Sequence, residues 1–337
     1  MHKSRVYQLL LVAAIASGAA SAAMAQMERL PPTDAVEEGP PVTVFSSSDV
    51  PVERLPPVVE EAAAGDDSSS SLPRDVRPGV FQKLIFEETW LPRFGSQGFG
   101  MNDVGLKMVL GLPCPTVDSP LIVTPGYMVH YLDGPETPDL PPQVYDAFVE
   151  FRWLHRFTPQ WGVDLDVAPG YYSDYQQSDS RAWRFTGHAI VAWTWTPLAT
   201  VVLGAAYEQR TQTPLIPVGG LIWNPNDDTK FNLVFPEPKI SRRIRWRRDG
   251  NADFEDWVYV AGEFANDTWT VLQPGLSSDL LTYRDIRAML GYEHKVFGGI
   301  SSKVEVGYVF SRKLQLTDQS INLDPTSTLM LRGGLTY

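Results

Sequence analysis

Cysteine is nearly absent from this 337-residue chain, since Cys114 is the only one, and no disulfide can form within it. Long apolar runs are also missing: no stretch of about 18 apolar residues occurs, so we expect no transmembrane helix. Basic residues are outnumbered, with 28 Lys and Arg against 40 Asp and Glu and a formal net charge of −12. This acidic balance disfavours nucleic acid as a partner.

The first segment has the features of a secretory signal. Lys3 and Arg5 precede a short apolar stretch at residues 9–15, which is too short to span a bilayer, and residues 23–25 (Ala-Met-Ala) form a cleavage site. Residues 1–25 are therefore predicted to be a signal peptide. No cysteine follows the cleavage site, so no lipid anchor is expected.

Residues 26–80 have a different composition from the rest of the chain. They are rich in Pro, Glu, Ala, Ser and Val, contain almost no aromatic residue, and carry the sequence Glu-Arg-Leu-Pro-Pro twice, at 28–32 and 53–57. Such a segment buries too little apolar area to offset the entropy lost on ordering. We predict a disordered, acidic, Pro-rich tether on the periplasmic side.

From residue 81 to 337 the sequence alternates with a period of two. In the run 300–313, for example, Val304, Val306 and Tyr308 share an apolar face opposite Lys303 and Glu305. The predicted strands are 81–91, 102–112, 120–131, 143–157, 160–175, 181–196, 198–211, 214–223, 229–235, 239–248, 254–264, 281–294, 300–314 and 327–337. That is about fourteen strands, or twelve if one hairpin of the Pro-rich region 214–248 is a loop.

Strand length, loop length and aromatic placement favour a membrane barrel over a soluble β-sandwich. Several strands run to about 14 residues, whereas soluble strands centre on five or six. Short connections such as 158–160 alternate with longer ones, among which we count 132–142, 265–280 and 315–327. The aromatic residues predicted to form girdles at the strand ends are Trp153, Trp161, Trp183, Trp193, Trp195, Tyr292, Tyr308 and Tyr337. The sequence therefore predicts an all-β fold, a closed antiparallel up-and-down transmembrane β-barrel.

Two segments resemble bacterial outer-membrane β-barrel proteins, and more closely a functionally uncharacterised barrel family. They are residues 283–293 and residues 304–312, and the resemblance covers 81–337. It implies location in the outer membrane and a C-terminal assembly signal read by the barrel-assembly machinery. Leu335 and Tyr337 match that signal, whereas Arg332 stands where the family usually has glycine.

Charged residues on the polar faces are predicted to line the lumen. The basic ones on strand 239–248 are Lys239, Arg243, Arg245 and Arg247, and the acidic ones on other strands are Asp146, Glu150, Asp164, Asp166, Asp285 and Glu305. Three readings stay open: a salt-bridge network that holds or plugs the barrel, charged rings that set the preference of a pore, and anion or lipopolysaccharide binding near 242–248.

No motif assigns chemistry to the chain. The five histidines lack metal-ligand spacing, so no metal or cofactor is predicted. His155 is expected on the lipid-facing side, but the sequence offers no serine partner, and no catalytic residue is predicted. We expect an outer-membrane pore for small polar solutes. A barrel with a blocked lumen, structural or surface-binding, is the alternative, and an outer-membrane lipid hydrolase is disfavoured.

Overall fold

The computed structural model describes residues 79–95, 98–116, 119–135, 137–176, 179–208, 215–247, 253–273, 275 and 277–337. The predicted signal peptide and the predicted tether, apart from Gly79 and Val80, lie outside the described residues. Within the described part, no helix is long and apolar enough to cross a membrane.

Almost all of the described chain is strand. The elements in order are β1 (Phe81–Leu91), β2 (Gly100–Thr116), β3 (Ser119–Asp133), β4 (Gln143–Arg156), β5 (Trp161–Ser173), the 3-10 turn η1 (Ser180–Ala182), β6 (Trp183–Thr196), β7 (Ala199–Glu208), β8 (Leu215–Asn226), β9 (Thr229–Phe235), β10 (Lys239–Arg247), β11 (Phe254–Gln273), β12 (Ser277–Val296), β13 (Ser301–Leu316), β14 (Ile321–Leu323) and β15 (Thr328–Thr336).

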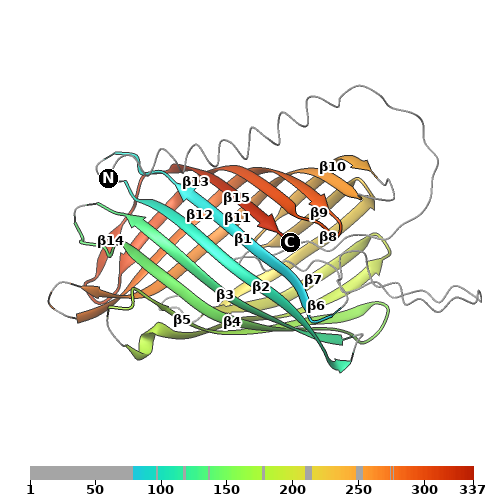
Figure 1. Cartoon of the computed structure of the whole chain (residues 1–337), viewed down its shortest axis with the longest axis horizontal. Coiled ribbons are helices and arrows are strands. Elements are labelled where there is room, and N and C mark those ends of the chain that lie inside the picture. The colour runs from blue at the N-terminus through green and yellow to red at the C-terminus, as the bar shows by residue number, and fades with distance from the viewer. Residues whose placement is uncertain are drawn as a thin grey trace, which may run out of the picture. The chain divides into compact units, whose positions relative to one another are not determined.

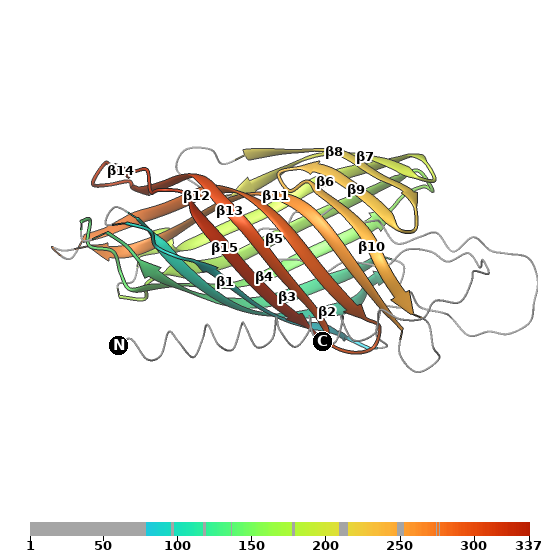
Figure 2. The same ribbon diagram turned by 90° about the horizontal axis from the view of Figure 1, so that it is seen from above.

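These strands form one closed antiparallel sheet (Figures 1 and 2). Each strand from β1 to β13 pairs with the next in sequence, and the ring closes because β15 pairs with both β13 and β1. Strand β14 adds only a short pairing to the end of β13. The predicted closed up-and-down barrel is therefore confirmed, with fourteen strands in the ring in the described part of the chain.

The structure decides two sequence predictions, the number of strands in the Pro-rich region 214–248 and the long loop at 265–280. The Pro-rich region forms three strands, β8, β9 and β10, so the fourteen-strand prediction holds over the twelve-strand one. The long loop predicted at 265–280 is wrong, because β11 and β12 run 20 residues each and stay paired out to Gln273 and Ser277. Polar residues such as Asn266 suggested a loop. In the structure, their backbone groups form hydrogen bonds with β12, so the strand continues through them.

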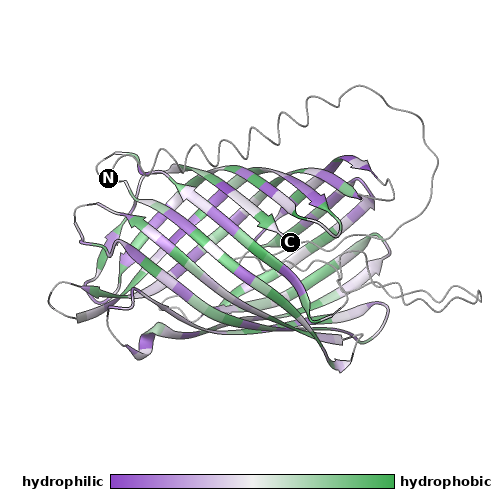
Figure 3. Ribbon diagram, in the orientation of Figure 1, coloured by the Kyte–Doolittle hydropathy of each residue, from purple (hydrophilic) through white to green (hydrophobic). Residues whose placement is uncertain are grey.

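Burial alternates along the strands as the sequence alternates. On β2, Leu106 is exposed whereas its neighbours Gly105 and Lys107 are buried. Figure 3 shows the same alternation of hydropathy along many strands. Charged side chains on the buried face contact other strands across the ring, so this face is the barrel interior and the exposed apolar face is its outside.

The two ends of the barrel are called rim A and rim B below. Rim A carries the start of β1, the end of β15 and the turns at 157–160, 197–198, 227–228 and 297–300. Rim B carries the connections at 134–142, 174–182 and 317–327. These rim-B connections are longer than the rim-A turns, as predicted, whereas the rim-B connections 236–238 and 274–276 are short.

The ring is pinched toward rim B. Strand β10 pairs with β11 only as far as Ala261, and the last backbone bond runs from Gly262 N–H to Pro238 O at 2.8 Å. Further along, Thr270 of β11 pairs in parallel with Ser173 of β5. At this level β11 lies beside β5, and strands β6–β10 are bypassed.

The bypassed strands contact the pinch through their interior face. Arg184 on β6 donates a hydrogen bond to the carbonyl oxygen of Thr268 on β11, and its guanidinium lies 3.4 Å from Thr270 Oγ1. Below this contact, Phe264 packs on a buried aliphatic cluster from β6–β9. The members of that cluster are Ile190, Ala192, Val202, Ala206, Ile216, Val218, Ile222 and Val234. Opposite walls of the barrel are thus joined by both polar and apolar contacts.

Candidate functional site

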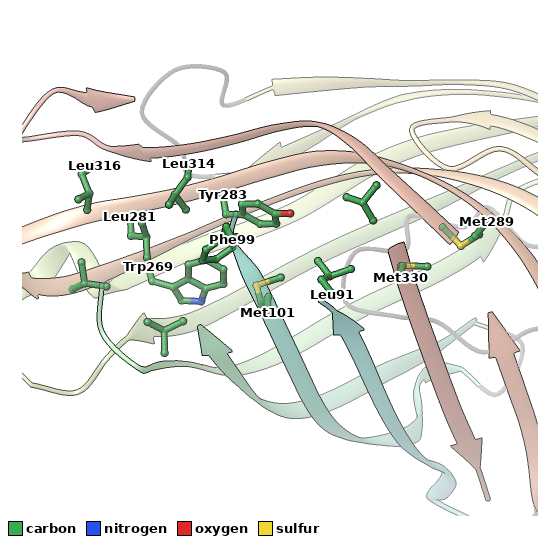
Figure 4. Close-up of a cluster of buried hydrophobic side chains, with 13 residues drawn as sticks. Leu91, Phe99, Met101, Trp269, Leu281, Tyr283, Met289, Leu314, Leu316 and Met330 are labelled. Atoms are coloured by element: carbon green, nitrogen blue, oxygen red, sulfur yellow. The ribbon is translucent and has the colours of Figure 1, made fainter. Parts of the chain in front are cut away.

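The rim-B half of the interior is filled by apolar side chains (Figure 4). The cluster comprises Leu91, Phe99, Met101, Val144, Trp269, Val271, Leu281, Tyr283, Met289, Val309, Leu314, Leu316 and Met330, none of them more than 5% exposed. Arg312 ties this cluster together, because its guanidinium donates to Tyr283 Oη at 2.7 Å and to Phe99 O at 2.7 Å. Side chains thus occupy the interior at this level.

A buried polar bridge crosses the barrel beside the apolar cluster. His130 on β3 lies between two carboxylates, with Nδ1 at 2.7 Å from Asp103 and Nε2 at 3.1 Å from Asp146. Asp146 on β4 also accepts a 2.7 Å hydrogen bond from the indole Nε1 of Trp269 on β11. The predicted lumenal residue Asp146 therefore links β4 to β11 on the interior side of β5, the strand that lies between them at this level.

Arg332 is the centre of the largest interior ion-pair cluster. Its guanidinium lies 2.8 Å from Glu263 and 3.1 Å from Glu305, and Nε donates to Thr89 Oγ1 at 3.1 Å. Glu87 lies 3.9 Å away. The residue that departs from the assembly-signal pattern therefore joins β15 to β11, β13 and β1.

The same cluster extends to β12. Arg287 pairs with Asp285 at 2.7 Å and with Glu263 at 2.9 Å. Glu305 also accepts a 2.6 Å hydrogen bond from Tyr259 Oη. Two of the predicted lumenal acids, Asp285 and Glu305, therefore form buried ion pairs with arginines. Their charges are neutralised and do not face a solute.

The remaining predicted acids lie together on β4 and β5. Asp164 is bound by the Arg152 fork, with Nε at 2.8 Å, and by His188 Nε2 at 3.1 Å. Asp166 lies 3.8 Å from His188 Nδ1, and Glu150 is half-buried on the same face of the neighbouring strand. This group forms a charged patch on the interior wall of β4–β6.

The four basic residues of β10 that were predicted to line the lumen do not all lie on the same face of the strand. Lys239 and Arg243 face inward: the Lys239 ammonium lies 3.9 Å from the centre of the Tyr259 ring, and Arg243 pairs with Glu255 at 2.9 Å. A β-bulge between Arg243 and Arg245 then shifts the register. Because two residues there oppose one, the alternation reverses after Arg243.

Beyond the bulge, the predicted lumenal residues Arg245 and Arg247 lie on the outside. Arg245 is opposite Asp256 and Arg247 is opposite Phe254. Even-numbered residues of β11 form the outer face at this level, as the 60% exposure of Val260 shows. The sequence carries no signal for this reversal, because the bulge depends on how β10 meets β11.

The predicted girdle residues lie on the outer face near the rims, except Tyr308, which lies midway along β13. At rim A, Trp161 stacks on Trp193, which stacks on Trp195, with ring centres 6.0 and 6.5 Å apart. The others at this end are Trp153, Tyr292 and Tyr337. Toward rim B lie Trp183, whose ring meets that of Tyr171 edge-on at 5.4 Å, and Tyr308, which is opposite Leu329.

A serine–histidine contact that sequence reasoning did not find lies at rim A. Ser119 Oγ is 3.0 Å from His155 Nδ1 and 3.1 Å from the carbonyl oxygen of Leu154, and the ring of His155 stacks on Trp153. Ser119 is only 2% exposed. The contact joins the rim-A ends of β3 and β4, and burial keeps the hydroxyl away from a substrate carbonyl.

Metal-binding geometry is not found in the part of the chain that the structure describes: no group of three or more His, Cys, Asp or Glu side chains is arranged to hold an ion. Cys114, at the rim-A end of β2, is exposed and unpaired with another cysteine.

Comparison with known proteins gives a family and a set of similar folds. Similar solved structures include a NanC porin (12% identity over 75% of this chain and 98% of that chain, TM-score 0.33). They also include LpxR from Salmonella typhimurium (8%, 76% and 99%, TM-score 0.34) and the transport unit of the autotransporter AIDA-I from Escherichia coli (8%, 77% and 89%, TM-score 0.25). No protein with a curated description matches. Residues 128–323 match the profile of DUF6268, a domain of unknown function, and the chain therefore belongs to that family.

Proposed function

We propose that this protein is an outer-membrane β-barrel with a closed interior, which acts through its outer surface and rim connections and not as a pore. The observation that carries the proposal is the hydrogen bond from Trp269 on β11 to Asp146 on β4, made inside the pinched barrel by an indole that is 0% exposed. An open lumen would leave inward-facing side chains at this level in contact with water.

The aromatic residues of the outer face support membrane embedding. Along β5, Trp161 and Tyr171 are ten residues apart, which at a rise of about 3.3 Å per residue is about 33 Å along the strand. A strand tilt of about 40° reduces this to a height of about 25 Å, the height of the apolar band of an outer-membrane barrel. Between them lie exposed apolar residues such as Leu165 and Val167.

The charges of the interior favour the blocked-lumen alternative over the solute pore. Asp164, Asp285 and Glu305 are all at most 5% exposed and each pairs with an arginine at 3.1 Å or less. A selectivity ring needs charges that face permeating solutes. Here the three carboxylates are instead neutralised by arginines of the same or the neighbouring strand.

The proposal includes export by a signal peptide and insertion by the barrel-assembly machinery. The predicted signal at residues 1–25 would direct export, and β15 would be the strand that meets the barrel-assembly machinery. Lipid hydrolysis is not included, because the one serine–histidine contact described above has a buried hydroxyl.

The test is the current carried by the purified full chain in a planar lipid bilayer, with a general porin inserted in the same way as positive control. We expect insertion, seen as heat-modifiable migration of the reconstituted protein, with no stable open level between pH 5 and 8. A reproducible single-channel conductance would overturn the closed interior, and failure to insert would overturn the membrane location.

A further inference from the structure

The outer face of β10–β12 at rim A carries an ordered cationic cluster. After the bulge, Arg245 lies on this face with Nε 2.9 Å from Asp256 Oδ2, and its guanidinium lies 4.9 Å from the centre of the Phe254 ring. The Arg245 side chain is still 40% exposed. The guanidinium is thus held on one side by a carboxylate and a ring, and the other side is open.

Asp256 is the buried anchor of the cluster. It is 3% exposed and accepts a 2.9 Å hydrogen bond from Tyr292 Oη, with His294 Nδ1 at 2.5 Å from the same oxygen. Its other oxygen lies 2.9 Å from Arg245 Nε as an ion pair. This buried carboxylate therefore positions the guanidinium and the imidazole from two strands.

Two further arginines lie on this face. Arg242 is opposite Val258, Arg247 is opposite Phe254, and both are exposed. Three arginines thus share the face with one buried carboxylate, Asp256. On this face the arginines outnumber the carboxylate that the register places among them.

The charges stand at the edge of an apolar surface. Ile240 is 44% exposed and Leu290 is 62% exposed on the same outer face, further from rim A. Tyr292, a predicted girdle residue, is level with Arg242 and lies between Leu290 and the level of Arg245. This order, apolar side chains followed by an aromatic ring and then cations, matches the order of acyl chain, glycerol and phosphate in a lipid leaflet.

We propose that this face binds the phosphate of an anionic glycerophospholipid, with Arg242 and Arg245 as the contacting cations and the acyl chains lying on Ile240 and Leu290. The inference rests on the proposed membrane location. Arginine suits this role because its planar fork donates two parallel hydrogen bonds to a phosphate. A soluble anion lacks the chains that would cover the adjoining apolar surface.

The experiment is native mass spectrometry of the full chain released from nanodiscs that contain equal amounts of phosphatidylglycerol and phosphatidylcholine. We expect retained phosphatidylglycerol on the wild-type protein and about tenfold less on the Arg242→Gln/Arg245→Gln variant. Lys313→Gln is the matched control, because it removes an exposed cation near rim B and should leave retention unchanged. Equal retention of both lipids, or retention unaffected in the double variant, would refute the site.

Three further measurements separate the possible causes of failure. Flotation with liposomes tests membrane embedding by itself, so a chain that floats but shows no lipid preference contradicts this inference alone. The single variant Arg242→Gln guards against misfolding, since Arg245 contacts Asp256 and Arg242 does not; it should lose part of the retention while keeping wild-type heat-modifiability. Addition of inorganic phosphate should not displace the lipid, and full displacement would assign the site to free anions.

Discussion

The indole Nε1 of Trp269 on β11 donates a 2.7 Å hydrogen bond to Oδ1 of Asp146 on β4. The two residues are on walls that are not neighbours in the sheet, and His130 holds the other oxygen of the same carboxylate. The contact lies at the pinch, where β11 pairs with β5 and β5 pairs with β4. It also places a buried polar chain where a pore would need water.

Replacing Trp269 by Phe should destabilise the barrel by about 1–3 kcal/mol, because it leaves Asp146 Oδ1 buried without its donor. The phenyl ring is smaller than the indole, so the loss combines the missing donor with a packing defect. The measurement is urea unfolding of the protein in lipid vesicles, followed by heat-modifiability. Trp195→Phe is the control, since Trp195 is 65% exposed on the outer face; an equal loss in both variants would contradict the bridge.

Replacing Arg332 by Gln should cost about 3–5 kcal/mol, because Glu305 is left as a buried carboxylate without its arginine and Glu263 keeps only Arg287. Arg332→Lys should restore part of that loss, since an ammonium supplies charge without the planar fork. The same vesicle-based unfolding measures both variants. If Arg332→Gln unfolds at the wild-type urea concentration, Arg332 does not hold β15 to β11.

Replacing Gly291 by Ala should destabilise the barrel by about 1–3 kcal/mol through overpacking. A Cβ at this position would lie 2.2 Å from the Tyr259 ring, and that ring is held by the hydrogen bond to Glu305. Gly333→Ala should be nearly neutral, because a Cβ there meets nothing within 4 Å. Thermal midpoints in one detergent compare the pair; equal midpoints would mean that the ring moves freely.

The connection before η1 should open more readily at low pH. The pKa of Asp179 is lowered, chiefly by the hydrogen bond from the Ser278 hydroxyl and then by that from the Arg181 backbone N–H. A lowered pKa in the closed connection means that the stabilisation is present above the normal Asp pKa, about 3.9, and is lost as pH falls through the lowered value.

Hydrogen exchange of residues 179–183, corrected for the intrinsic rate at each pH, measures this opening. Wild type should be better protected than Asp179→Asn at pH 6, and the two should converge near pH 2. A difference that persists unchanged at low pH would show that the carboxylate charge does not stabilise the connection.

Alternation was sufficient to predict the ring and most of its strands. Val304, Val306 and Tyr308 alternate with charged residues because one face meets apolar surroundings and the other a polar interior. The same rule correctly extended through the region 214–248, because Pro217 and Pro225 lie outside the part of β8 that pairs on both sides and Pro236 and Pro238 lie between β9 and β10. The prediction failed at 265–280. Asn266 and Asp267 are residue types that favour turns, but here they are paired within the long hairpin of β11 and β12.

The interior contacts could not be predicted in the same way. Trp269 was assigned to a loop, so its bond to Asp146 had no place in the expected lumen. Arg245 was assigned to the interior because alternation cannot foresee a bulge. Arg332 was noted only because it departs from the C-terminal assembly-signal pattern. Its partners Glu263 and Glu305 lie on other strands, and only the folded barrel shows that they are in contact with it.

The accessibility of Val309 to an aqueous thiol reagent tests the closed interior most directly. Val309 is inward-facing and 0% exposed, and cysteine is close to valine in size. In a Cys114→Ser background reconstituted in liposomes, we predict that Val309→Cys does not react with a charged methanethiosulfonate, whereas Asp228→Cys, in an exposed rim-A turn, reacts fully. Reaction of Val309→Cys at a rate near that of Asp228→Cys would contradict the account, because it would require a water-filled lumen.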